Sequence, residues 1–295
     1  MARRYTITPL LPSDAHRVRL SWSSRYTPQA LAQHLSAYPG LSCWIPESGE
    51  YVIAGPWRHR SEIIGILELS ANQHAPVLLD YVSEAAHEHG ARLLVMQEQH
   101  ERRSPIFYAN VGFTLIEQIL VYELTVFHPP MPDGRLRFER VSPDDPFVFG
   151  ELLSVDHTAF SWLWRNSEAE FTDYLADPQV DVYLGRNAQG EAVSYVGVTR
   201  MRGWGHLDRL AVGRDYQGQG YGLASLTWAV WLLAQRGAHR VALSTQARNR
   251  RSRALYERFG FHRTPSFDYD IYGRWLGEPV PLDDEVEIHD HRLKG

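Results

Sequence analysis

The sequence predicts an α+β protein built of two related domains in tandem. Two observations support this: a turn-rich segment near the middle of the chain, and strand and helix patterns that occur in the same order on either side of it. The chain has 295 residues, of which 44% are hydrophobic and 22% charged. These values are typical of globular proteins with a sizeable core.

The linker candidate is the segment FHPPMPDGRL at residues 127–136. Its prolines bias the preceding residues away from helix, and its Asp-Gly pair favours a turn. We therefore predict a first domain over 1–128, a linker over 129–136, and a second domain over 137–295 that includes a C-terminal tail.

Strand-like and helix-like segments alternate in the same order in both halves. They lie at 62–70, 76–90, 91–97 and 108–124 in the first half, and at 205–212, 221–237, 238–244 and 256–261 in the second. Tyr108 and Tyr256 are 148 positions apart, and so are Gly112 and Gly260. Such constant spacing across several elements indicates a duplicated domain rather than a solenoid of short repeats.

The two copies differ in one strand-to-helix loop. The second copy has GRDYQGQGYG at 213–222, whereas the first has SANQHAP at 70–76, without glycine. Glycine lets a backbone approach a ligand closely, and the first amides of a helix are unpaired donors at the positive end of its dipole. The loop therefore predicts an anion site suited to a diphosphate. The spacing of the glycines in this loop fits neither the Rossmann dinucleotide-binding motif nor the Walker phosphate-binding motif.

Two motifs in this half resemble those of the GCN5-related N-acetyltransferase (GNAT) superfamily. The segment Gln217–Gly222 matches the Q/R-x-x-G-x-G/A signature, and Asn249–Phe261 is similar to the second motif. The resemblance is strong over 206–261 and extends over 135–274 by the order of elements. It is weak over 1–126, which lacks the phosphate loop.

The resemblance implies a fold of two tandem GNAT-like domains in αβα layers. Each would be a mixed, mostly antiparallel sheet flanked by helices, and the N-terminal copy would be degenerate. This layout is similar to that of mycothiol synthase, although it also occurs in unrelated acyltransferases.

The resemblance also implies acetyl-CoA as the co-substrate. In the family, the end of a strand pairs with the pantetheine arm, and the amides of the glycine loop hold the pyrophosphate. The residues implied are Leu210, Ala211, Val212, Gln217, Gly218, Gln219, Gly220, Tyr221, Gly222 and Leu223, with Asn249 and Ser252 of the second motif. Solvated side chains are the alternative for Gln217 and Gln219, since the loop needs mainly their amides.

Tyr256 matches the family tyrosine that gives a proton or a hydrogen bond to the departing thiolate. A phenol suits this task because its unperturbed pKa, about 10, is close to that of a thiol. The alternative is a tyrosine packed beside Phe259 and Phe261, which is what we expect of Tyr108 in the first copy.

His206 and Asp208 are the candidate bases. Strand alternation over 205–212 places them on one face, with Leu207 and Arg209 on the other. An unperturbed histidine titrates near pH 6.5, which suits a base. Asp208 either orients His206, serves alone or binds a cationic substrate. Pairing with nearby arginines, or a water chain without a single base, would also account for the pattern.

The acceptor is expected near two helices at 146–160 and 167–178. Between them Phe160, Trp162 and Trp164 occupy alternate positions. They would bind an apolar, aromatic or cationic group, or else pack in the core.

The sequence thus predicts transfer of an acetyl group from acetyl-CoA to a primary amine of a small molecule, by direct attack on the thioester. The alternatives are a protein N-terminal or lysine acetyltransferase and a non-catalytic CoA-binding regulatory protein. The net charge of −5 gives no reason to expect nucleic acid or membrane as a partner, and no metal site is expected. A single cysteine, Cys43, and the lack of a signal-peptide pattern favour the cytoplasm. Monomer and homodimer both remain open.

Overall fold

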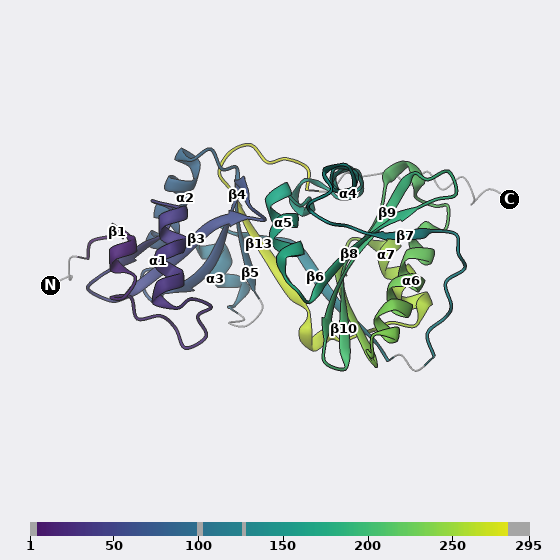
Figure 1. Ribbon diagram of the computed structural model, residues 1–295. Coiled ribbons are helices and arrows are strands. Elements are labelled where there is room, and N and C mark those ends of the chain that lie inside the picture. The colour runs from purple at the N-terminus through teal and green to yellow at the C-terminus, as the bar shows by residue number, and fades with distance from the viewer. Residues whose placement is uncertain (1–4, 99–102, 126–127, 283–295) are drawn as a thin grey trace. The chain divides into compact units, whose positions relative to one another are not determined.

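The computed structural model describes residues 5–98, 103–125 and 128–282. These form two compact units, each a mixed sheet with helices (Figure 1). Of the described residues, unit 1 contains 5–121, Thr245–Arg253 and Arg263–Pro279, and unit 2 contains Tyr122–Ser244, Ala254–His262 and 280–282. The predicted α+β class with a mostly antiparallel sheet is confirmed.

Unit 1 has its strands hydrogen-bonded in the order β1-β2-β3-β4-β5-β13-β6. The strands are β1 (Thr8–Pro9), β2 (Cys43–Ile45), β3 (Glu50–Trp57), β4 (Arg60–Ser70), β5 (Leu93–Glu98), β6 (Thr114–Thr125) and β13 (Tyr269–Trp275). The helices are α1 (Pro28–Ala37), α2 (Ala75–Glu88) and α3 (Pro105–Asn110), with short 3₁₀ turns η1 (Pro12–Asp14) and η4 (Pro265–Phe267). Strands β4 and β5 are parallel. Unit 2 has an equivalent parallel pair, β10 and β11.

Strand β3 is buried on both faces, which makes unit 1 three layers thick. Tyr51 and Ile53 pack in a cluster with α1, whereas Val52 and Ala54 pack in a second cluster with α2. Because successive side chains of a strand point to opposite faces, the two helices must cover opposite sides of the sheet.

Unit 2 has the order β6-β11-β10-β9-β8-β7. The strands after β6 are β7 (Arg137–Arg140), β8 (Val180–Arg186), β9 (Ala192–Met201), β10 (Trp204–Val212) and β11 (Arg240–Gln246), and β12 (His262–Arg263) pairs with β6. The helices are α4 (Pro146–Ala159), α5 (Glu168–Ala176), α6 (Tyr221–Gln235) and, from Ala254 on, α7 (Arg250–Phe259), with 3₁₀ turns η2 (Trp162–Trp164) and η3 (Arg214–Tyr216).

Strand β9 shows which helices cover which face of unit 2. The Ser194 hydroxyl lies 3.0 Å from that of Ser225 on α6. Tyr195 bonds to Asp156 on α4, and Gly197 faces the Tyr174 hydroxyl on α5. Helix α6 therefore covers one face, and α4 and α5 cover the other.

Strand β13 and the end of β6 each lie in the unit formed mainly by the other half of the chain. Strand β13 follows α7 in sequence but lies in unit 1, antiparallel to both β5 and β6. Conversely, Tyr122–Thr125 at the end of β6 belong to unit 2, where β6 neighbours β11. Each unit thus contains a strand segment from the other half of the chain.

Residues 128–136 contain no helix or strand. The division into 1–128, 129–136 and 137–295 stays a prediction about the sequence repeat, since the compact units interleave along the chain. Of the predicted tail, 283–295 lie outside the described residues. Within the described ranges, no helix combines the length and the apolar character needed to cross a membrane.

Candidate active site

The glycine loop joins β10 to α6 in unit 2. Gly218 and Gly220 have φ of +79° and +88°, in the left-handed region that favours glycine. Gly220 is the N-cap of α6, and no side chain caps this helix. In the part of the chain that the structure describes, the amides of 218–223 donate no hydrogen bond. These backbone donors at a helix N-terminus fit a phosphate group.

Side chains of the loop hold its shape. The Gln217 side-chain amide donates to the carbonyl of Val212 (3.1 Å), and that of Gln219 donates to the carbonyl of Asp215 (3.1 Å). Both glutamines therefore have structural bonds within the loop. Arg135, at the end of the predicted linker, donates to the Gln219 carbonyl (3.3 Å). Sequence patterns gave no signal for Arg135, because its contact with the loop is not local.

Strand β10 separates from β11 before it ends. It pairs with β11 from Trp204 to Leu207 only, whereas its pairing with β9 continues to Val212. The β11-facing edge of Leu210, Ala211 and Val212 is therefore free of strand pairing, and an extended ligand would add there as a further strand. This geometry fits the role predicted for the three residues, although the Ala211 side chain itself packs in the core.

A β-bulge interrupts β10 at Asp208, and it corrects the predicted alternation. Leu207 pairs with Val198 on β9, while Arg209 pairs with the adjacent Gly197, which leaves Asp208 as the extra residue. A bulge resets which face the following side chains point to. Asp208 and Arg209 consequently contact the same layer, α4 and α5, so the prediction that they lie on opposite faces is wrong.

Asp208 lies at the centre of a polar cluster. Its Oδ1 is 2.6 Å from Nδ1 of His206, and its Oδ2 accepts a hydrogen bond from the Thr199 hydroxyl at 2.6 Å. The hydroxyl of Tyr174, on α5, donates to the same Oδ2. The structure thus brings His206 and Asp208 together, and it adds two residues that the sequence reasoning missed.

Two features keep the Tyr174 hydroxyl in place. A Cβ on Gly197 would lie 2.7 Å from this hydroxyl, so the glycine leaves the space that the phenol needs. Burial, together with the negative charge of Asp208, raises the pKa of Tyr174 well above its usual value. The phenol therefore stays protonated and acts as a donor.

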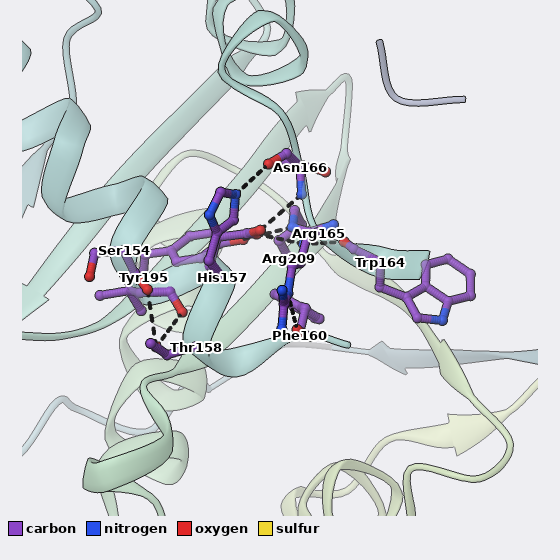
Figure 2. A network of polar contacts seen from close by, with 11 residues as sticks. Ser154, His157, Thr158, Phe160, Trp164, Arg165, Asn166, Tyr195 and Arg209 are labelled. Carbon is purple, nitrogen blue, oxygen red and sulfur yellow. Dashed lines mark hydrogen bonds and ion pairs between the residues drawn. The ribbon is translucent and has the colours of Figure 1, made fainter. Parts of the chain in front are cut away.

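Arg209 forms a second network, drawn in Figure 2. Its guanidinium donates to Asp156 (2.6 Å), to the Tyr195 hydroxyl (2.7 Å) and to the carbonyl of Trp164 (3.0 Å). Asp156, fully buried, also accepts from the amide of Asn166 (2.9 Å). The network ties the segment 160–166 to β10. Asp156 is thus the buried ion-pair partner of Arg209.

The predicted acceptor residues lie on this tied segment. The Phe160 ring is 4.0 Å from the Arg209 guanidinium carbon, so its packing is explained without a ligand. Trp162 and Trp164 lie on η2, and both are half-buried. Figure 2 shows the Trp164 indole pointing away from Arg209, while its carbonyl faces that residue. A role in acceptor binding stays a prediction for all three.

Tyr256 on α7 is 5% exposed and lies among aromatic rings. Its ring centroid is 6.4 Å from that of Tyr122 and 6.0 Å from that of Phe261. The equivalent Tyr108 is stacked on Tyr272, with centroids 3.5 Å apart. Each tyrosine therefore packs against a tyrosine of an exchanged strand, and the catalytic role of Tyr256 stays a prediction.

Asn249 and Ser252 form a local helix cap. The Asn249 side-chain oxygen accepts from the amide of Ser252 (3.0 Å), just before α7 begins at Arg250. This bond gives the Asn249 side chain a structural role at the start of α7. The first turn of α6 contacts α7 further along, where a Cβ on Gly222 would lie 3.5 Å from Leu255.

In unit 1 a carboxylate lies where unit 2 has the glycine loop. Oε1 of Glu50 accepts from the amides of Asn72 (2.6 Å) and Gln73 (2.8 Å), ahead of α2, and Oε2 contacts the His74 imidazole. Partial burial alone would raise the pKa of Glu50, but the hydrogen bonds from His74, Gln73 and Asn72 lower it to about 2. The N-terminal copy thus carries its own anion at this helix end.

No group of three or more His, Cys, Asp or Glu among the described residues is arranged to hold a metal ion. The expectation of a metal-free site stays a prediction.

Comparison with known proteins decides the family. The model of the acetyltransferase (GNAT) family matches residues 149–261, which include most of α4, the helices α5 to α7, the bulge and the glycine loop. Residues 149–261 form a GNAT domain. No curated protein matches the chain in sequence.

Solved structures share the fold over nearly the whole chain. A GCN5-related N-acetyltransferase from Sphaerobacter thermophilus is 18% identical, with 96% of this chain and 99% of that chain covered and a TM-score of 0.59. A tandem GNAT protein from the clavulanic acid biosynthesis pathway is 14% identical, with 94% and 100% covered and a TM-score of 0.54. A GCN5-related N-acetyltransferase from Kribbella flavida is 14% identical, with 92% and 71% covered and a TM-score of 0.63.

These likenesses show the predicted fold with its tandem layout. The GNAT domain supports acetyl transfer as the general chemistry of the protein.

Proposed function

We propose that the protein transfers an acetyl group from acetyl-CoA to a primary amine of a small molecule. The observation that carries the proposal is the conjunction of two features at the end of β10. The strand edge at 210–212 is free of pairing on one side, and the amides of 218–223 are unpaired donors in the described chain. Together they match a long, extended ligand whose arm carries amide groups and whose other end carries a diphosphate.

This geometry supports a proposal for the residues that would hold acetyl-CoA. The backbone of Leu210–Val212 would pair with the pantetheine arm, and the amides from Gly218 to Leu223 would bind the pyrophosphate. When bound, acetyl-CoA supplies an activated acyl group as a thioester. Side chains larger than hydrogen at Gly218 and Gly220 would strain the left-handed backbone that aims these amides.

The proton transfers would be carried by residues of the same domain. The cluster of His206 and Asp208 would take the proton that the amine loses, and the Tyr256 hydroxyl would hold a proton for the departing thiolate. The fixed segment 160–166 would border the acceptor, with Trp162 and Trp164 as candidate contacts.

One co-substrate per chain is proposed, bound in unit 2. The Glu50 carboxylate already accepts the amides that precede α2 in unit 1, so a phosphate there would meet a like charge. The first copy would then contribute structure rather than a second active site.

The test combines a binding measurement with a turnover assay. Isothermal titration should give one acetyl-CoA per chain, and coenzyme A release should be seen with members of a panel of small primary amines. Gly220→Ala should weaken acetyl-CoA binding at least about tenfold, the effect of roughly 1.4 kcal/mol.

Gly190→Ala is the matched control, because Gly190 also has a positive φ (+84°) but lies in the loop between β8 and β9. It should keep wild-type affinity. Two acetyl-CoA molecules per chain, or equal affinity of the Gly220→Ala variant and wild type, would contradict the proposal. Turnover with peptide N-termini or lysines alone would replace the small-molecule acceptor by a protein.

A further inference from the structure

The hydrogen bonds around Asp208 leave its carboxylate little freedom. Oδ2 accepts from two hydroxyl groups, Thr199 and Tyr174, and Oδ1 lies 2.6 Å from Nδ1 of His206. An ionised carboxylate has only acceptor atoms. Each of its three neighbours must therefore donate, and the imidazole can do so only if Nδ1 carries a proton.

The two hydroxyl groups are fixed donors. Burial raises the pKa of Tyr174 well above its usual value, so the phenol remains protonated, and Gly197 leaves room for it on β9. Thr199 pairs directly with His206 across β9 and β10, which places its hydroxyl beside the bulge. The donors come from α5 and β9, so they hold the carboxylate from two independent elements.

We propose that Tyr174 and Thr199 are positioning residues that fix Asp208 as an acceptor, and that His206 is the base. In this arrangement neutral His206 carries its proton on Nδ1, donated to Asp208. Its Nε2 presents a lone pair, and no described residue is hydrogen-bonded to this atom. The inference rests on the proposed function, and it decides between the two candidate bases.

The proton balance is simple. Nε2 of His206 accepts one proton from the amine as its nitrogen bonds to the acyl carbon, and the imidazole becomes a cation. The Asp208 carboxylate, still ionised, stabilises that cation through the Nδ1 hydrogen bond. Asp208 itself neither gains nor loses a proton.

The test reads the tautomer of His206 directly in the full chain. Long-range ¹H–¹⁵N correlation spectra of histidine-labelled protein distinguish protonated from bare ring nitrogens, and a His206→Gln variant assigns the signal. At a pH where histidine is neutral, wild type should show His206 protonated on Nδ1. Tyr174→Phe and Thr199→Val should each shift the population toward Nε2–H, and Thr199→Ser, which keeps the hydroxyl, should restore it.

The signals of the other histidines report whether each variant is folded. A wild-type His206 protonated on Nε2 would overturn the assignment of the base. An Nδ1–H tautomer that is unchanged in both Tyr174→Phe and Thr199→Val would overturn the positioning role. Neither result depends on acetyl-CoA, so the titration and turnover measurements test the proposed function separately.

Discussion

At the bulge in β10, a single extra residue decides what two neighbouring side chains do. In a regular strand Asp208 and Arg209 would face opposite helical layers. With the bulge, Asp208 contacts Tyr174 while Arg209 contacts Asp156, on the same face. The polar cluster proposed for catalysis and the network that fixes segment 160–166 are therefore direct neighbours along the backbone.

Tyr256 and its equivalent Tyr108 allow a matched comparison. Both are buried, and both pack against a tyrosine, so Tyr→Phe removes one hydroxyl from a similar aromatic setting. We expect Tyr256→Phe to lower kcat about a hundredfold or more, because it removes a proton donor. Tyr108→Phe should keep wild-type kcat. Coenzyme A release across pH measures both, and equal rates for the two variants would mean that Tyr256 only packs.

The residues that the sequence predicted well are those with local signals. Gly218 and Gly220 of the loop have the left-handed φ that glycine permits, a property of the residues themselves. Tyr174 and Arg135 were missed because each acts through a partner 34 or more positions away. The bulge was missed because alternation assumes a regular strand.

At the scale of elements, the start of α2 shows how a helix end can be satisfied internally. The Glu50 carboxylate accepts from amides ahead of α2, as an anion at a helix N-terminus does. Helix α6, in the equivalent position, begins with Gly220 and no side-chain cap. The N-terminus of α2 thus has an anion of the protein itself beside it, whereas the N-terminus of α6 has no side-chain acceptor among the described residues.

Glu50→Gln should destabilise the protein by about 1–3 kcal/mol, since hydrogen bonds to a charged acceptor are replaced by weaker ones. The pKa of Glu50 is about 2 in the folded protein and about 4.3 in the unfolded chain. The ionised carboxylate therefore stabilises the fold fully above a pH of about 4.3, and this stabilisation is lost as the pH falls toward 2. The difference in unfolding free energy between wild type and variant should shrink as pH falls from about 5 toward 2.

Denaturant unfolding at several pH values measures this difference. Glu47→Gln is the control, because Glu47 is exposed in the same hairpin and the charge change is identical. A pH-independent difference would show that the carboxylate is not what holds the loop. The stoichiometry of acetyl-CoA should remain one per chain.

The elements themselves were predicted closely from periodicity. Helix α6 was expected at 221–237 and lies at Tyr221–Gln235, and the strand expected at 62–70 is β4 at Arg60–Ser70. The exchange of β6 and β13 was not predicted. Strand pairing between distant segments depends on tertiary packing, which local patterns do not contain.

For the whole molecule, the exchange means that a cut in the linker should not release two independent domains. If a protease site is placed after Gly134, the first fragment still carries Tyr122–Thr125 of unit 2, and the second carries β13 of unit 1. We expect the cleaved fragments to co-elute in native size-exclusion chromatography and to separate only in denaturant. Separate elution of two folded fragments would contradict the exchange.

The position of β13 also bears on synthesis. Ribosomes release a chain from its N-terminus, and β5 emerges long before Tyr269–Trp275, the strand that pairs with it. At about 5–20 residues per second, the delay is on the order of ten seconds or more. Throughout that time one edge of β5 lacks its partner, and such an edge is a template for pairing with other chains. The half that is translated first is therefore the half that waits longest for the strand that completes its sheet.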